Sequence, residues 1–168
     1  MRAPGSSGEA GAEWEGFRAK QAEDLDWFDR WDSVCSWDLP FAKGFVGGTL
    51  NVSVNCLDRH IAAGRGERIA FHWEGEPGDS RAVTYQQLLD EPSRVANLLR
   101  ELGIVTGDRV AIYMGMVPET VAALLASARL GAPPSVVFRG FPAPSAPARL
   151  PDPHAPLPIA VAPARRRG

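Results

Sequence analysis

The alternation of apolar and polar positions is clearest in the middle of the chain, where it predicts a β-hairpin. The stretches "ERIAFHWEG" (67–75) and "RAVTY" (81–85) are rich in β-branched and aromatic residues. The Gly, Pro and Asp residues between them are typical of a tight connection. His72 falls inside the first strand, where a single histidine more often faces a cross-strand neighbour than acts as a catalyst.

A long helix is predicted directly after the hairpin. Thr84 and Gln87 have the spacing of a capping box, and Gly103 marks the end of the periodic pattern. Pro92 interrupts the helix, where a proline costs about 3 kcal/mol and bends the backbone. Local rules give no reason for it. The apolar stripe consists of Leu88, Val95, Leu99 and Leu102.

The pattern that follows predicts the beginning of a parallel sheet. "DRVAIYMGM" (108–116) is an almost unbroken apolar run, typical of a strand buried on both faces. "PETVAALLASARL" (118–130) predicts a helix with proline at its first position, and "SVVF" (135–138) predicts a second buried strand. Strand, helix and strand in this order form a βαβ unit with a right-handed crossover. The predicted fold class is α/β.

The region before the hairpin holds four of the five tryptophans, interleaved with acidic residues. Leu25, Phe28 and Trp31 recur at helical spacing and predict a short amphipathic helix that Pro40 ends at the latest. The tryptophans are expected to pack as a helical layer rather than to form a ligand cage. A second helix is expected over residues 55–64.

Both ends of the chain are predicted to be irregular. Residues 1–13 form a Gly/Ser/Ala-rich lead that is expected to be disordered. Eight of the fifteen prolines lie between Pro142 and Pro163, and neither a helix nor a central strand persists at that density. Residues 142–168 are therefore predicted to be an irregular Pro/Ala/Arg-rich tail.

Composition narrows the function classes. The net charge of −2 is too small to favour nucleic acid or an anionic membrane as a partner. Cys35 and Cys56 do not form a disulfide framework or a cysteine metal site, and they fit a reducing compartment. The N-terminus lacks the pattern of a targeting peptide, and no apolar stretch is long enough to cross a membrane. We expect a cytoplasmic protein.

No motif in the chain predicts a complete active site. Asp58, Arg59 and His60 are consecutive on a predicted helix, so their side chains point in three directions and cannot act together. The phosphate-binding, nucleophile-elbow and zinc motifs are all missing from the sequence. The turns at 113–119 and 138–144 follow predicted parallel strands, and the first could offer amides to an anion. We predict no catalytic and no metal-binding residue.

Four stretches together resemble one enzyme family. They are "DLDWFDRWDSVCSWDLPFAKGFVGGTLNVSVNCLDRH", "AFHWEGEPGDSRAVTYQQLL", "GDRVAIYMGMVPE" and "ARLGAPPSVVFRGF". In these stretches the chain resembles the AMP-forming acetyl-CoA synthetases, which are adenylate-forming ligases. The resemblance implies a synthetase N-terminal segment over 14–60 and the start of an AMP-binding domain over 61–141. The family has tryptophan where this chain has Gly44 and histidine where it has Pro134.

The resemblance implies a two-step reaction of acetate, ATP (with Mg) and CoA. Acetate attacks ATP to give acetyl-adenylate and pyrophosphate, and the CoA thiol then displaces AMP. In the family, the groups that hold ATP and the acyl chain follow the matched region. We therefore expect an incomplete N-terminal domain that is inactive by itself. The alternatives are a non-catalytic CoA-nucleotide-binding or interaction fragment, and a degenerate product without a stable fold.

A CoA site is implied by the resemblance at two places near the end of the chain. The family has a glycine at Arg139, and a side chain there hinders the close approach of a ligand. The other place is the run of arginines at the end of the chain. A solvated tail is the alternative to a CoA-nucleotide contact there. The residues implied are Phe138, Gly140, Arg166, Arg167 and Gly168.

Overall fold

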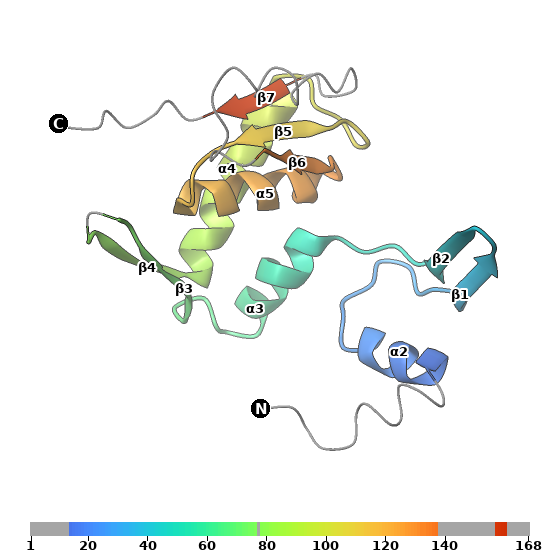
Figure 1. Ribbon diagram of the computed structural model, residues 1–168. Helices are drawn as coiled ribbons and strands as arrows, with labels where there is room; N and C mark the ends of the chain where they lie inside the picture. Colours follow the sequence, from blue (N-terminus) through green and yellow to red (C-terminus); the bar gives the residue numbers. More distant parts are fainter. Residues whose placement is uncertain (1–13, 77, 138–156, 161–168) are drawn as a thin grey trace. The chain divides into compact units, whose positions relative to one another are not determined.

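The computed structural model describes residues 14–76, 78–137 and 157–160. The chain divides into two compact units, Met1–Asn51 and Val52–Gly168. Figure 1 shows the elements of each unit in sequence colours. Among the described residues, no helix is long and apolar enough to span a membrane.

The first unit contains one helix and one hairpin. The helix is α2 (Trp14–Ala22), and the antiparallel strands are β1 (Ser33–Asp38) and β2 (Phe41–Val46). The prediction of a helix around Leu25–Trp31 is wrong. These residues form an irregular segment whose backbone is hydrogen-bonded to the chain after β2. The hairpin 33–46 was not predicted.

Hydrogen bonds and aromatic packing explain the irregular segment. Its backbone N–H at Phe28 donates to the Thr49 carbonyl at 2.8 Å, and Thr49 N–H donates to Asp29 at 2.9 Å. Trp27 and Trp31 lie 4.8 Å apart between ring centroids, and both rings contact Phe45 of β2. Of the residues that suggested a helical stripe, Trp31 therefore packs against a strand residue, whereas Leu25 and Phe28 are exposed.

The second unit begins with a helical segment and the predicted hairpin. The π-helical η1 (Val54–Asp58) continues into α3 (Arg59–Ala62), which overlaps the helix predicted over 55–64. The strands β3 (Ile69–Glu74) and β4 (Ser80–Thr84) pair antiparallel, which confirms the hairpin. His72 lies opposite Ala82 in this ladder.

Helix α4 (Tyr85–Glu101) follows, and its capping box is confirmed. Gln87 N–H donates to Thr84 Oγ1, and Gln87 Oε1 accepts from Thr84 N–H. The helix continues through Pro92, whose side chain is fully buried. Burial of apolar area offsets part of the cost of the missing backbone donor.

The predicted βαβ unit is confirmed. It consists of β5 (Val110–Tyr113), α5 (Pro118–Leu130) and β6 (Pro134–Val136), with β5 and β6 parallel. The prediction that the second strand is buried is wrong, because all three residues of β6 are exposed. Pro118 occupies the first position of α5, and Gly131 ends it with a left-handed φ of 69°.

A third parallel strand corrects one part of the prediction for the tail. Strand β7 (Leu157–Ala160) pairs with β5, so the sheet order is β6-β5-β7. The prediction of irregular backbone is wrong for these four residues. Because β7 is an edge strand in this sheet, a proline such as Pro158 is tolerated there, whereas a central strand would lose a ladder bond.

The main core of the second unit lies between α4, α5 and β5, which Figure 1 shows gathered together. Its fully buried members include Val110 and Ile112 of β5 and Ala126 of α5. A smaller core joins η1, β4 and α4 through Leu57, Val83 and Leu88. The last residue on the predicted stripe, Leu102, is instead 58% exposed.

Candidate functional site

The turn between β5 and α5 is the described part of the chain that lies where parallel sheets often bind ligands. Its carbonyl groups are already engaged. Thr120 Oγ1 donates to the Gly115 carbonyl at 2.6 Å, and Trp73 Nε1 donates to the Met116 carbonyl at 2.8 Å. The turn is therefore held by its own helix and by the β3–β4 hairpin.

A carboxylate stands at the beginning of α5. Glu119 lies in the first helical turn, where the helix dipole favours a negative charge. The guanidinium of Arg81 lies 3.6 Å from Glu119 and 2.9 Å from Glu91 of α4. Since Glu119 supplies negative charge here, this helix start is less suited to the anion that the sequence pattern allowed for.

The Asp58-Arg59-His60 triplet is scaffold, because its three side chains have different partners. Asp58 binds Arg129 of α5, while Arg59 donates to Asn55 one helical turn earlier at 3.3 Å. The His60 ring packs against the Tyr85 ring with centroids 4.7 Å apart. The three side chains therefore lie against different partners, as their consecutive positions on a helix predict.

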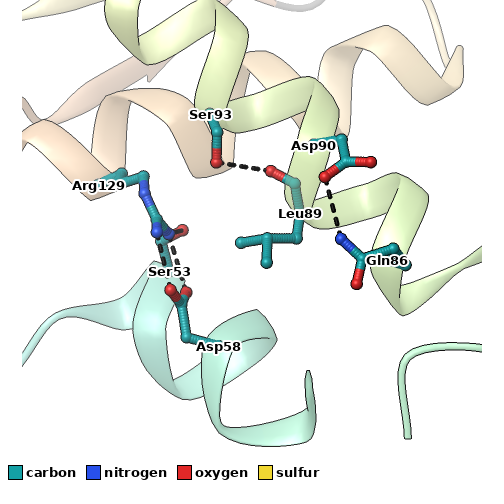
Figure 2. A network of polar contacts seen from close by, with 7 residues as sticks. All are labelled: Ser53, Asp58, Gln86, Leu89, Asp90, Ser93 and Arg129. Carbon is teal, nitrogen blue, oxygen red and sulfur yellow. Dashed lines mark hydrogen bonds and ion pairs between the residues drawn. The ribbon is translucent and has the colours of Figure 1, made fainter. Parts of the chain in front are cut away.

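The Asp58–Arg129 pair joins the segment 54–62 to α5 through two hydrogen bonds between charged groups. Figure 2 shows the guanidinium reaching down to both carboxylate oxygens, at 2.7 and 2.8 Å, with Ser53 beside them. Arg129 also donates to Ser53 Oγ at 3.3 Å. Such a two-pronged arrangement fixes orientation as well as distance. The pair therefore helps to orient the helical segment, which also packs through Leu57.

The same contact shifts both ionisation equilibria. The hydrogen bonds from Arg129 lower the pKa of Asp58 below its ordinary value, and partial burial opposes this shift. Hydrogen bonding to Asp58 raises the pKa of Arg129. Both groups are therefore held in their charged forms at neutral pH, which suits a structural clasp rather than proton transfer.

Helix α4 carries two further polar contacts near this region. Figure 2 shows Gln86 donating to Asp90 at 3.0 Å and Ser93 Oγ donating to the Leu89 carbonyl at 2.7 Å. Both are bonds within one helix, so they stabilise α4 locally and offer no group to a ligand.

Open hollows occur in both units. One of about 440 Å³ lies on the β3–β4 hairpin, and one of about 280 Å³ lies in the first unit near the aromatic cluster. The first is lined by His72, Trp73, Glu74, Ser80, Arg81 and Ala82. It holds no nucleophile paired with a base, and no group of three or more His, Cys, Asp or Glu within the described ranges could hold a metal ion.

The residues implied at the CoA site all lie outside the described residues. This applies to Phe138 and Gly140 and to the basic run 166–168. Sequence analysis missed the partners Arg129, Trp73 and Arg81. Their contacts join residues separated by 71, 43 and 10 positions, for which local patterns carry no information.

Two family models match neighbouring parts of the chain. Residues 8–56 match the acetyl-coenzyme A synthetase N-terminus, and residues 58–162 match the AMP-binding enzyme family. The second match covers more than half of the chain.

Curated relatives match across nearly the whole chain. It is 54% identical over 154 residues to an acetyl-coenzyme A synthetase of Mycolicibacterium smegmatis, covering 90% of this chain and 16% of the relative. It is 52% identical over 161 residues to that of Streptomyces avermitilis, covering 95% and 25%. A Gemmatimonas aurantiaca synthetase is 53% identical over 132 residues, covering 79% and 20%. The chain thus spans a quarter or less of the length of these relatives.

Proposed function

Because this chain belongs to the AMP-binding enzyme family, we propose that it supplies the N-terminal part of an acetate–CoA ligase. The reaction proposed is the attack of acetate on ATP, followed by displacement of AMP by the CoA thiol. The observation that carries this proposal is the pair of adjacent matches, first to the synthetase N-terminus and then to the AMP-binding region. The identity of 52–54% to acetyl-coenzyme A synthetases supports acetate as the acid.

The CoA contact is proposed at Phe138 and Gly140, with the basic run 166–168 holding a phosphate of the CoA nucleotide. Arginine suits that role because its planar fork of donors matches a phosphate group. Arg139 stands in a position where the resemblance implies glycine, so its side chain is proposed to weaken the approach of CoA.

ATP and Mg²⁺ belong to the proposed reaction, but the described residues do not fit them. The helix start at α5 carries Glu119, and no carboxylate cluster suited to a metal occurs within the described ranges. When bound, ATP would supply the activated phosphate and the metal would neutralise its charge. We propose that the 168 residues alone do not complete the reaction, and that the protein acts in the cytoplasm on small molecules.

A chimera tests the proposal. Residues 14–141 would replace the matched region of the Streptomyces avermitilis relative, and acetate-dependent exchange of pyrophosphate into ATP would be measured. We expect the chimera to catalyse exchange and to form AMP when CoA is added. A chimera that folds like the parent enzyme but catalyses no exchange would overturn the ligase proposal. So would acetate-dependent exchange by the 168-residue chain alone.

The CoA contact has its own test in the same chimera. Arg139→Gly removes the side chain from the proposed approach path, so we expect the KM for CoA to fall while the exchange reaction, which needs no CoA, is unchanged. An unchanged KM for CoA would contradict a contact at Phe138 and Gly140.

A further inference from the structure

One face of the β3–β4 hairpin reaches the turn that follows β5. Trp73 and Arg81 are directly opposite each other in the ladder, so their side chains project from the same face. Trp73 Nε1 donates to the Met116 carbonyl at 2.8 Å. Arg81 lies 3.6 Å from Glu119, three residues further along the chain. The hairpin therefore contacts α5 both just before its first residue, at Met116, and in its first turn, at Glu119.

Packing does little to fix the outer part of this turn. The side chain of Met116 is 88% exposed, whereas Met114, two residues earlier, is in the core. Inside the turn, Val117 N–H donates to the Gly115 carbonyl at 2.9 Å. The Met116 carbonyl has Trp73 as its donor, so this hydrogen bond is the tie between the turn and the hairpin.

The turn lies beside the end of β6. Strands β5 and β6 are parallel with Ile112 opposite Val136, and Val137 N–H donates to the Ile112 carbonyl at 2.9 Å. Parallel neighbours reach the same edge of the sheet at their carboxyl ends. Val137 is followed in the sequence by Phe138, the first residue of the proposed CoA contact.

We propose that Trp73 and Arg81 are positioning residues, which hold the β5–α5 turn in place beside the segment that begins the CoA contact. This proposal rests on the proposed function. Arg81 is anchored in turn by Glu91 of α4 at 2.9 Å, so the hairpin is tied to both helices.

A purely stabilising role does not account for these contacts well. The side chains of Arg81 and Glu119 are 40% and 58% exposed, and exposed ion pairs add little to folding stability. Together with the Trp73 hydrogen bond to Met116, they connect the hairpin to the turn and to the first residues of α5. Their removal should therefore change the placement of the turn more than the stability of the core.

Hydrogen exchange of the 168-residue chain tests the placement directly. Trp73→Phe keeps an aromatic ring but removes the N–H donor. We expect the amides of Val117 and Val137 to exchange about fivefold faster, the factor that corresponds to one net hydrogen bond. The amide of Leu99 in α4 should be unchanged. Trp37→Phe, at an exposed tryptophan of the first unit, is the matched control. Unchanged exchange at Val117 and Val137 would overturn the proposal.

The chimera tests whether this placement matters for CoA. With Trp73→Phe, we expect the KM for CoA to rise by about fivefold while acetate-dependent pyrophosphate exchange stays the same. A parallel loss in both reactions, or an unchanged KM, would overturn a positioning role. Arg81→Lys keeps the charge, so it should avoid most of any rise in the KM for CoA that Arg81→Gln causes. An inactive parent chimera would instead contradict the ligase proposal. The hydrogen-exchange measurement on the 168-residue chain would then decide the positioning role.

Discussion

The two units differ in where they keep their large apolar side chains. In residues 14–51 the single buried apolar residue is Ala22, while Phe28, Trp37, Leu39 and Phe41 are 65–77% exposed. In the second unit Val110 and Ile112 are completely buried, and most of the other core residues lie around them. The first unit is held by backbone hydrogen bonds and one aromatic cluster, and the second by a layered core. Stability should therefore respond to mutation very differently in the two units.

The largest expected effect comes from the core of the second unit. Leu99→Ala removes a side chain that is 2% exposed, and it should lower the free energy of unfolding by about 2–5 kcal/mol. Leu98→Ala, at the adjacent residue of α4, is the control because Leu98 is 54% exposed and should change the free energy by less than about 0.5 kcal/mol. Urea unfolding followed by helical circular dichroism measures both. Equal losses would contradict the assignment of the core.

The next effect concerns the Asp58–Arg129 pair within the second unit. The two side chains are 32% and 27% exposed, so the pair is intermediate between an exposed ion pair and a buried one. We expect a coupling free energy of about 1–2 kcal/mol from a double-mutant cycle of Asp58→Asn and Arg129→Gln. Additive losses would show that the pair does not couple the segment 54–62 to α5.

The pair also predicts the direction of a pH dependence. The folded pKa of Asp58 is lowered, so its contribution is fully present above the unfolded pKa and is lost as pH falls through the folded pKa. The difference in unfolding free energy between wild type and Asp58→Asn should therefore be constant near neutrality and shrink in acid. A difference that grew as the pH fell would contradict the pKa direction.

An effect of similar size is expected where α5 ends. Gly131 has φ 69°, and an added Cβ would lie 2.9 Å from Thr106 Cγ2. Gly131→Ala should therefore cost about 1–2 kcal/mol or more, because a left-handed backbone conformation is combined with a steric contact. Gly103→Ala has the same conformational penalty at φ 90° but no neighbour within 4 Å. A thermal unfolding comparison should show the larger loss of stability for Gly131→Ala. Equal losses for the two variants would show that the contact with Thr106 does not contribute.

The smallest effect, of opposite sign, lies in the first unit. Gly44 is in β2 with nothing within 4 Å of an added Cβ, so Gly44→Val should stabilise the hairpin by about 0.5 kcal/mol. Gly48→Val is the contrasting variant, because its Cβ would lie 2.6 Å from the Trp27 ring. Tryptophan fluorescence during unfolding reports on this unit. A loss of stability in both variants would show that the hairpin has no room at Gly44.

The same contrast explains which elements could be predicted from the sequence. The hairpin 69–84 and helix α4 were predicted correctly from periodic patterns. The βαβ unit was predicted from the helix signals of α5 and from the unbroken apolar run of β5, whose residues are almost all buried. The β1–β2 hairpin was missed because its side chains are largely exposed and leave no such pattern. Leu25, Phe28 and Trp31 then mimicked a helical stripe, although Leu25 and Phe28 are exposed and Trp31 packs against Phe45.

The candidate site was less predictable than the fold. Capping and turn rules depend on neighbours in the sequence, and they succeeded at Thr84 and at Gly131. Contacts such as Trp73 with Met116 depend on how the hairpin docks, which no local rule gives. The strand β7 was missed for a similar reason, because a short edge strand can tolerate a proline once a neighbouring strand is available.

The clasp between Asp58 and Arg129 has a consequence for synthesis on the ribosome. The two residues are 71 positions apart. At elongation rates of about 5–20 residues per second, roughly 4–14 s pass between the emergence of the aspartate and that of its arginine. During this interval the segment 54–62 has been made but lacks its partner on α5. A nascent chain therefore exposes the apolar side of that segment, including Leu57, to chaperones before it can dock.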